Sequence, residues 1–319
     1  MQILPLCSKK LSGLRRPVLT VGTFDGVHLA HRAIVEEVVK RARKSGGTSL
    51  VVTFEPHPQF ILDTQTAPPL LTTQEEKFEI LSHLELEGAV LLPFTRELAQ
   101  MEAADFVKEI LHQKLGVWEV VIGHDHAFGR GRRGRLKTLK ELGSQLGFKV
   151  DAVEPILYRG APISSTRIRR KLLAGLVRDA GEMLGRPYHL TGKVVSGNGR
   201  GRILKYPTAN MKVQHRKLIP ANGVYAVASD LDGITLCGLL NVGLRPTFGG
   251  GARTVEIHFF DFRGSLYGKE INVQLIEKIR DEERFEDGAQ LSEQIRKDEE
   301  VARRLLASDT SLNLHCTEV

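Results

Sequence analysis

Two histidines, His28 and His31, stand three positions apart in the segment Gly22-Thr23-Phe24-Asp25-Gly26-Val27-His28-Leu29-Ala30-His31. Residues three apart share one side of a helix, and their side chains lean toward its N-terminus. The unpaired N–H groups at that end, together with two imidazoles, would hold an anion such as a polyphosphate. A packed histidine pair without a ligand, or a metal site completed by the segment 124–126, are the alternatives that these residue types leave open.

Two later segments carry polar groups at comparable places. Gly123-His124-Asp125-His126-Ala127-Phe128-Gly129 follows an apolar run that reads as a strand. Ile163-Ser164-Ser165-Thr166-Arg167-Ile168-Arg169 opens a helical pattern with hydroxyl groups and places Arg169 in its first turns. Hydroxyls at a helix start with an arginine nearby suit a phosphate or pyrophosphate, although a hydroxyl-rich start alone is usually a cap.

These three segments, in this order, resemble the HxGH nucleotidyltransferases, and specifically the adenylyltransferase half of the bacterial bifunctional riboflavin kinase/FAD synthetase family. The resemblance implies that an FMN phosphate attacks the α-phosphorus of ATP. It implies roles in ATP or phosphate binding for Thr23, Phe24, Asp25, His28, His31, Ser164, Ser165, Thr166 and Arg169, with His28, His31 and Arg169 in the catalytic set, and a flavin-side role for Asp125. Ala30 stands where the family has glycine, and His126 where it often has an aromatic residue.

A second glycine-rich stretch spans Gly192 to Gly201 and is followed by Tyr206-Pro207-Thr208-Ala209-Asn210. Glycines with basic residues can wrap phosphates, and a hydroxyl with an amide oxygen can coordinate Mg²⁺. Such a stretch alone is more typical of a turn, and it lacks the ending of a P-loop. Together with later segments it resembles the riboflavin kinase signature, with Lys205-Tyr206 as a departure. The resemblance implies ATP binding by Gly192, Lys193, Gly197, Thr208 and Asn210, and Mg²⁺ binding by Thr208 and Asn210.

Glu256 is the predicted catalytic base of the second half. In the alternation Val255, Glu256, Ile257, His258 the apolar pair faces one side of a strand and Glu256 the other. A carboxylate in a cleft can accept the proton of an attacking hydroxyl, whereas an isolated strand glutamate would simply be exposed. By resemblance this hydroxyl is the 5′-hydroxyl of riboflavin, and Arg280 and Phe285 border the flavin.

The elements expected around these segments differ between the two halves. The first half alternates apolar strands with helices, which predicts a parallel sheet covered on both faces, with ligands at the carboxyl ends of its strands. Expected strands are 18–22, 50–54, 89–92, 117–122 and 148–153; expected helices are 29–44, 73–84, 103–115 and 138–146. The second half contains alternating β-segments at 224–229, 235–242, 254–262 and 271–279, an Asp232-Gly233 turn and a helix at 292–306.

These patterns predict an α/β chain in which a nucleotidyltransferase-type, Rossmann-like sheet precedes an antiparallel β-barrel with a C-terminal helix. The predicted domains are residues 1–184 for adenylyl transfer and residues 185–319 for the kinase. A length of 319 residues fits two domains. ATP, riboflavin, FMN and FAD are the predicted substrates and products, and Mg²⁺ the predicted cofactor.

The net charge of +7 fits nucleotide phosphates or a nucleic acid, and the densest basic run is Arg130–Arg135. We expect no nucleic-acid partner, since that run contains no aromatic residue for stacking on bases. Three cysteines without a CxxC pair and the absence of a long apolar run predict a cytoplasmic protein, neither secreted nor membrane-spanning. Separately, we expect a monomer or a weak homo-oligomer, which these patterns do not determine. The alternatives are a same-fold enzyme with only the kinase active, adenylation of another phosphate or of a non-flavin acceptor, and a basic nucleic-acid-binding module.

Overall fold

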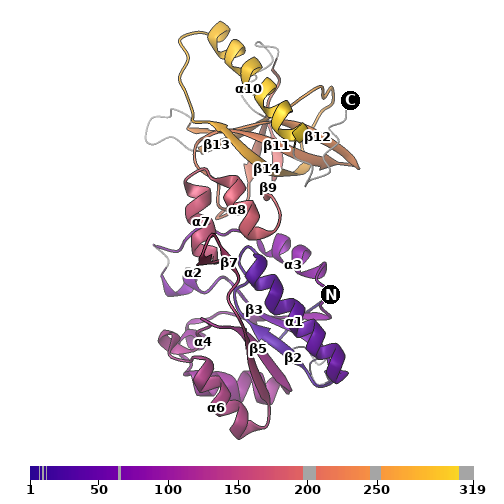
Figure 1. Ribbon diagram of the computed structural model, residues 1–319, viewed down its shortest axis with the longest axis vertical. Coiled ribbons are helices and arrows are strands. Elements are labelled where there is room, and N and C mark those ends of the chain that lie inside the picture. The colour runs from indigo at the N-terminus through magenta and orange to yellow at the C-terminus, as the bar shows by residue number, and fades with distance from the viewer. Residues whose placement is uncertain are drawn as a thin grey trace. The chain divides into compact units, whose positions relative to one another are not determined.

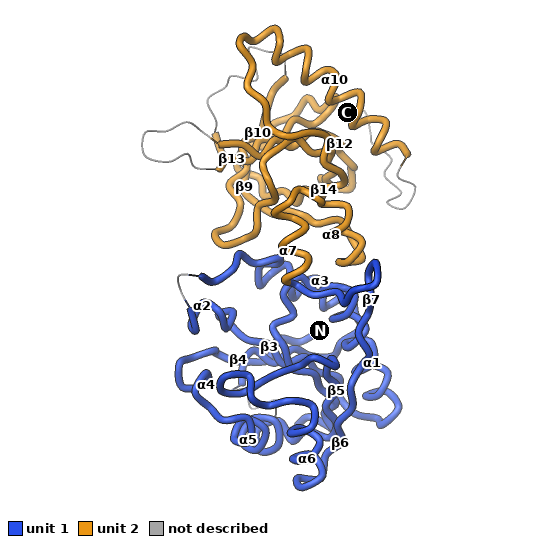
Figure 2. Tube along the Cα trace, turned by 60° about the vertical axis from the view of Figure 1, so that its left-hand side comes forward, with its two compact units in different colours: residues 1–165 blue, residues 166–319 orange. Residues whose placement is uncertain are grey.

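The chain folds into two compact units. A computed structural model describes residues 1–6, 8, 11, 13–63, 66–196, 206–244 and 253–308. Contacts divide it into Met1–Ser165 and Thr166–Val319, which are coloured blue and orange in Figure 2. The predicted domain boundary between residues 184 and 185 stays a prediction; the helices α7 (Ser165–Leu173) and α8 (Val177–Leu184) lie between that boundary and the division by contacts.

The first unit is built on a six-stranded sheet with the order β1-β4-β3-β2-β5-β6, in which every pairing is parallel. Its strands are β1 (Gln2–Pro5), β2 (Val18–Val21), β3 (Ser49–Glu55), β4 (Gly88–Pro93), β5 (Glu119–Gly123) and β6 (Lys149–Val153). The predicted parallel sheet is therefore confirmed, while the short strand β1 escaped prediction.

The helices of this unit follow the predicted order. They are α1 (Leu29–Ser45), α2 (Gln59–Leu62), α3 (Gln74–Ser82), α4 (Arg96–Gln100), α5 (Ala103–Asp105), a π-helix (Phe106–Lys114), a 3₁₀ turn (Arg130–Arg132) and α6 (Leu136–Leu146), and a small hairpin pairs β7 (Leu157–Tyr158) with β8 (Ala161–Pro162) (Figure 1). The predicted capping box is present: the Thr73 hydroxyl accepts from the N–H of Glu76, whose carboxylate accepts from the N–H of Thr73.

Both faces of the sheet are buried, which explains the continuous apolar runs of its strands. Leu19, Leu50 and Val120 belong to one core cluster, which includes side chains from the π-helix and α6. Their chain neighbours Val18 and Val51 belong to the other cluster, together with side chains from α1 and α3. The alternation of Cβ directions along each strand feeds both clusters.

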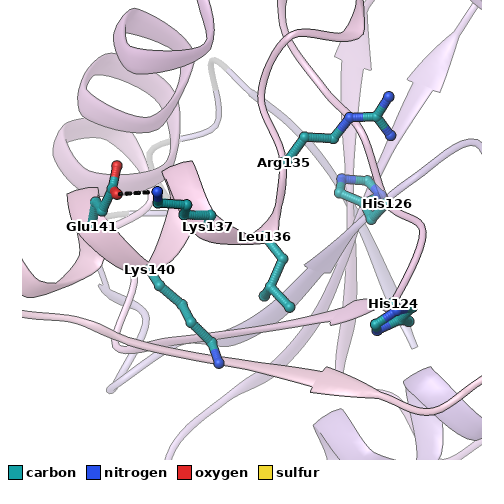
Figure 3. Close-up of a pocket in the computed structure, with 7 residues that line it drawn as sticks. All are labelled: His124, His126, Arg135, Leu136, Lys137, Lys140 and Glu141. Carbon is teal, nitrogen blue, oxygen red and sulfur yellow. Dashed lines mark ion pairs between the residues drawn. The ribbon is translucent and has the colours of Figure 1, made fainter.

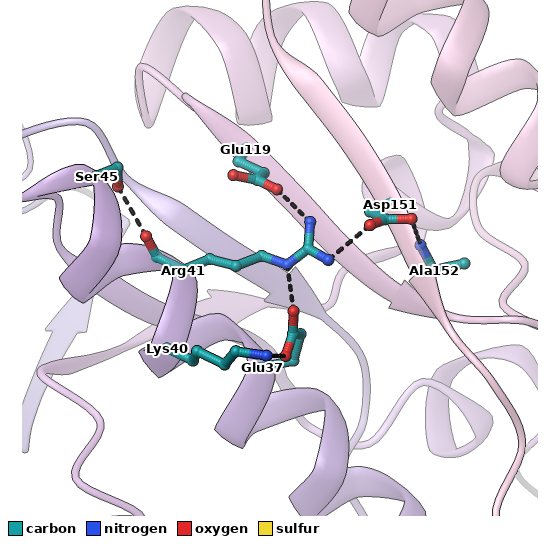
Figure 4. Close-up of polar contacts among 7 residues, drawn as sticks. All are labelled: Glu37, Lys40, Arg41, Ser45, Glu119, Asp151 and Ala152. Atoms are coloured by element: carbon teal, nitrogen blue, oxygen red, sulfur yellow. Dashed lines mark hydrogen bonds and ion pairs between the residues drawn. The ribbon is translucent and has the colours of Figure 1, made fainter.

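The two ends of α1 are closed differently. At its start the His28 side chain acts as the N-cap, and at its end Gly46 takes a left-handed conformation with φ 60°. Near that end the Arg41 guanidinium contacts Glu37 at 2.7 Å, Glu119 on β5 at 2.5 Å and Asp151 on β6 at 2.6 Å (Figure 4). One arginine thus ties the helix to two neighbouring strands.

The second unit contains a closed antiparallel barrel with the strand order β10-β13-β12-β11-β14-β9. Its strands are β9 (Tyr188–Val195), β10 (Ala209–Val213), β11 (Gly223–Leu231), β12 (Ile234–Leu244), β13 (Arg253–Phe259) and β14 (Glu270–Arg280), and the helix α10 (Gly288–Ser308) follows. Asp232 and Gly233 both have positive φ, as a two-residue type I′ hairpin turn requires. The predicted barrel and closing helix are confirmed; β9 and β10 were not predicted as strands.

Among the described helices, none has both the length and the apolar character needed to cross a bilayer.

Candidate functional sites in the two units

The loop between β2 and α1 has an unusual backbone. Phe24, Gly26 and Val27 have φ of 51°, 85° and 38°. A left-handed conformation is rare for a β-branched residue such as Val27 and must be held by its surroundings. The loop ends at His28, whose Nδ1 accepts a hydrogen bond from the N–H of His31 at 3.3 Å. The predicted histidine pair therefore begins a helix, as expected.

The two imidazoles stack on each other at the helix start. Their ring centroids are 3.6 Å apart with an interplanar angle of 16°, and Phe24 lies edge-on to His31 at 5.1 Å. Burial, and then the neighbouring charge of His28, lowers the pKa of His31 well below its usual value. Nδ1 of His31 is buried without a hydrogen-bond partner among the described residues. Such an atom is expensive to leave unpaired, so it suits a ligand that would complete it.

Asp25 braces this loop from inside the protein. Its carboxylate is buried and accepts from the N–H groups of Leu71 and Thr72, both at 3.0 Å. The N–H of Gly26 donates to the Thr72 hydroxyl at 3.0 Å. The predicted ATP-binding residue Asp25 thus uses its carboxylate to fix the loop. Leu71 and Thr72 lie far from the histidines in sequence, and no local signal pointed to them.

The third segment reaches the first through one hydrogen bond. The Ser165 hydroxyl donates to the backbone carbonyl of Asp25 at 2.9 Å. Two of the three segments that resemblance grouped together are therefore adjacent in the first unit. Thr166 and Arg169 belong to the second unit, where Arg169 is buried on α7 and Thr166 is exposed. Their predicted role in phosphate binding, like that of Ser164, stays a prediction.

The second segment lines a basic pocket beside α6. The cavity measures about 480 Å³ and is lined by His124, His126, Arg135, Leu136, Lys137, Lys140 and Glu141 (Figure 3). Burial, and then the charge of Arg132, lowers the pKa of His126 to about 4, so this ring is neutral at neutral pH. Asp125, predicted to contact the flavin, is exposed and does not line the pocket. The last arginine of the basic run, Arg135, contributes to this pocket.

In the barrel, Glu256 lies between two asparagines on adjacent strands. On β13 it pairs with Asn210 of β10 and with Asn241 of β12. Residues directly opposite in a sheet project to the same face, so the three polar side chains form one row. Val255 and Ile257 are buried while Glu256 is half-buried, which confirms the predicted alternation. Asn241 was not predicted as a site residue, but its position opposite Glu256 makes it a candidate site residue.

The Thr208 segment is held against the same strand. Nδ1–H of His258 donates to the Pro207 carbonyl at 2.9 Å, and Tyr206 meets the His258 ring edge-on. Thr208 and Asn210 therefore lie beside Glu256. A hydroxyl, an amide oxygen and a carboxylate in neighbouring positions are the hard oxygen donors that Mg²⁺ accepts, so these residues fit the predicted ion. Within the described part of the chain, no group of three or more His, Cys, Asp or Glu is arranged for a metal, including at His28 and His31.

Gly192 has a structural reason to be glycine. It lies within β9 opposite Val213, and a Cβ there would approach the Lys212 carbonyl oxygen of β10 to 2.6 Å. Lys193 beside it is exposed. Gly197 lies outside the described residues. The predicted phosphate contacts of these three residues stay predictions.

Arg280 and Phe285, the predicted flavin neighbours, contact each other and α10. The Arg280 guanidinium lies 5.6 Å from the Phe285 ring centroid. It also donates to the buried Asp298 carboxylate through Nε at 3.0 Å and through its second terminal nitrogen at 2.8 Å. Arg280 therefore anchors the C-terminal helix to β14. The predicted place of Arg280 and Phe285 beside the flavin stays a prediction.

Comparisons with known proteins match the two halves of the chain to two families. A family model for FAD synthetase matches residues 11–167, and one for riboflavin kinase matches residues 184–306. The bifunctional riboflavin kinase/FMN adenylyltransferases of Escherichia coli K12 and Pseudomonas fluorescens are each 37% identical to the chain, over 90% and 91% of it and 91% and 93% of the relative. A crystal structure from Streptococcus pneumoniae, titled a macrolide-efflux protein, matches with a TM-score of 0.85 and 31% identity, over 95% of this chain and 99% of the other.

Proposed function

The chain belongs to the family of bifunctional riboflavin kinase/FMN adenylyltransferases. From this membership we propose which reaction each of its two units catalyses. The barrel unit converts riboflavin and ATP into FMN and ADP. The sheet unit converts FMN and ATP into FAD and pyrophosphate. The observation that carries the kinase assignment is the row Asn210–Glu256–Asn241 across three strands of the barrel.

In the kinase step the 5′-hydroxyl of riboflavin attacks the γ-phosphorus of ATP, and ADP leaves. Glu256 accepts the hydroxyl proton as the new P–O bond forms. Thr208 and Asn210 are the residues that would hold Mg²⁺, which when bound neutralises charge on the ATP phosphates. His258 keeps the Thr208 segment in place through Pro207. Asn241 orients the carboxylate of Glu256 from the opposite strand.

In the adenylation step a phosphate oxygen of FMN attacks the α-phosphorus of ATP, and pyrophosphate leaves. No protein nucleophile is needed, because positioning and charge neutralisation carry this kind of transfer. The stacked rings of His28 and His31 at the start of α1 bind ATP phosphates. Thr23 and Phe24 border the nucleotide, while Ser164, Ser165, Thr166 and Arg169 bind the leaving pyrophosphate. Asp125 contacts the flavin side.

The kinase assignment is tested with Glu256→Gln. Loss of the base should lower riboflavin phosphorylation by about a hundredfold or more, while FAD formation from supplied FMN stays unchanged. Chromatography of the flavins after incubation with ATP and Mg²⁺ separates riboflavin, FMN and FAD. Glu270→Gln, which changes an exposed glutamate at the start of β14, is the matched control. Full kinase activity in Glu256→Gln would refute the role of Glu256.

The same assay in the unchanged protein decides between the remaining alternatives. FMN without FAD would show that only the kinase is active or that the sheet unit adenylates another phosphate. Binding of nucleic acid through Arg130–Arg135 would instead show affinity that falls steeply with salt. A cytoplasmic location and a monomeric or weakly associated state are further parts of the proposal; light scattering over a range of concentrations tests the second.

A further inference from the structure

Lys77 is a buried lysine beneath the loop between β2 and α1. It follows the capping box of α3, and the whole residue is only 7% exposed. Its Nζ donates to the Thr53 hydroxyl on β3 at 3.3 Å and to the Thr23 carbonyl at 3.5 Å. The amine therefore lies at the carboxyl ends of β2 and β3, where ligands bind in parallel sheets.

The charge of Lys77 has no carboxylate partner among the described residues, and its ammonium group lies 5.6 Å from the centroid of the Phe78 ring. Its two hydrogen-bond acceptors are uncharged oxygens, and it forms no ion pair with a described carboxylate. Burial lowers the pKa of Lys77, and the more distant carboxylates of Glu55 and Asp25 oppose this effect. Removing an ammonium group from water without pairing it costs several kcal/mol. An apolar residue would serve the core better, so stability alone does not account for this lysine.

Thr23 connects this lysine to the ATP loop. Its carbonyl accepts from both Lys77 and the Thr53 hydroxyl, which donates at 3.3 Å. The next residue, Phe24, has positive φ and contacts His31. A displacement of the Thr23 carbonyl would therefore also move Phe24, which contacts His31.

We propose that Lys77 is a positioning residue for adenylation. Its ammonium group holds the Thr23 carbonyl, and with it the loop that presents His28 and His31, and its positive charge favours the ATP polyphosphate above that loop. This inference rests on the proposed adenylyltransferase function of the sheet unit. Lys77 acts through Thr23 and through its charge, and it takes no part in the kinase step.

The first test compares Lys77→Met, Lys77→Arg and the control Lys44→Met, which changes an exposed lysine at the end of α1. Loss of the charge and of a charge-assisted hydrogen bond should raise the KM for ATP in FAD formation about tenfold or more. Lys77→Arg should recover a substantial part of this loss, and Lys44→Met should behave as the unchanged protein. Riboflavin phosphorylation by the same samples should be equal in all four proteins.

Trp118 provides an independent measure of folding. It is the chain's one tryptophan and lies in the first unit just before β5, so its fluorescence reports unfolding of the unit that contains Lys77. A merely structural lysine would lower the unfolding midpoint of Lys77→Met and leave the KM for ATP of the folded fraction unchanged. That result would overturn the proposal.

A second test needs no variant of Lys77. Because its pKa is lowered, the ammonium group of the unchanged protein should lose its proton at a lower pH than an exposed lysine. The kcat/KM for ATP in adenylation should therefore fall as the pH rises through this pKa. This fall is the alkaline limb of the pH profile, and the profile of the kinase step should lack it. Lys77→Arg should move the limb to higher pH. The carboxylates of Glu55 and Asp25 act on the amine, and that of Glu75 acts on Glu55.

The outcomes separate the inference from its premise. If the unchanged protein forms no FAD from FMN, the proposed adenylyltransferase function fails. If it forms FAD, and Lys77→Met has an unchanged KM or the alkaline limb is absent, only the inference about Lys77 fails. If Lys77→Met does not fold, the pH profile of the unchanged protein decides.

Discussion

The two ends of α1 show two different ways of treating buried polar groups. At its C-terminal end, Arg41 meets three carboxylates and its hydrogen-bonding capacity is largely used. At its N-terminal end, His31 keeps a buried nitrogen without a described partner, and Lys77 beneath the same loop is buried with uncharged acceptors only. The helix and the sheet are shared, so burial alone does not explain the difference. Paired groups stabilise one end, and the incomplete groups lie at the end where we propose that ATP phosphates bind.

The largest effect should come from His28→Asn. Asparagine keeps a side-chain acceptor for the N-cap, so the free energy of unfolding should change by less than about 0.5 kcal/mol. The imidazole that binds phosphate is lost, so adenylation should fall by about a hundred- to a thousandfold. The rate of FAD formation from FMN measures the loss of adenylation. Urea unfolding followed by Trp118 fluorescence measures the free energy of unfolding. A large loss of stability with normal turnover would reverse the comparison between the two ends.

Arg41→Met should have the opposite profile. Removal of the guanidinium leaves Glu37, Glu119 and Asp151 near one another without their shared cation. Because the Arg41 side chain is 26% exposed, we expect a loss of about 1–3 kcal/mol in unfolding free energy, less than for a fully buried pair. The kcat of adenylation in the folded fraction should stay within about twofold, since the change lies far along the helix from His28.

Arg43→Met is the matched control for Arg41→Met. Arg43 pairs with Glu85 at 3.0 Å on the same helix, but the two side chains are 65% and 71% exposed. Exposed pairs contribute little, so its unfolding free energy should change by less than about 0.5 kcal/mol. Equal losses in the two variants would show that the Arg41 network is no stronger than a surface pair.

The smallest expected effect is the uptake of a proton by His31 when ATP binds. The pKa of His31 is lowered by burial and by His28, so its ring is neutral at pH 7 in the free protein. A bound polyphosphate favours the protonated form, and ATP binding should therefore take up a fraction of a proton and tighten by about two- to fivefold as the pH falls from about 8 to about 6. Calorimetry in two buffers with different ionisation enthalpies measures the uptake. His31→Gln should abolish it, and uptake that persists in this variant would assign the proton to another group.

Much of this fold follows from short-range patterns in the sequence. The continuous apolar runs identified five of the six parallel strands, and Thr73 with Glu76 fixed the start of α3. The Asp232-Gly233 turn and the alternation around Glu256 identified the hairpin and the strand that carries the predicted base. These features were predictable because their causes lie within a few residues of one another.

Long-range contacts were not predictable in the same way. The sequence did not show that the Asp25 carboxylate accepts from the N–H groups of Leu71 and Thr72. It also did not show that the Arg280 guanidinium pairs with Asp298 on α10. The predicted roles of Asp25 and Arg280 beside ATP and the flavin stay predictions. Lys77 and Asn241 were missed because their surroundings are set by strand order, which single residues do not encode. The residue types indicated the chemistry, whereas the contacts that position these residues depend on tertiary pairing.

The brace at Asp25 also has a consequence for biosynthesis. It joins positions 46 residues apart, so the loop that carries His28 lacks the N–H donors that fix its shape until Leu71 and Thr72 are available. A nascent chain that ends before this point can form β2 and the first turns of α1, but it lacks the partners that fix the loop between them. Competence to bind a nucleotide should thus appear abruptly during translation, after residue 72 has emerged, rather than accumulate as the first helix grows.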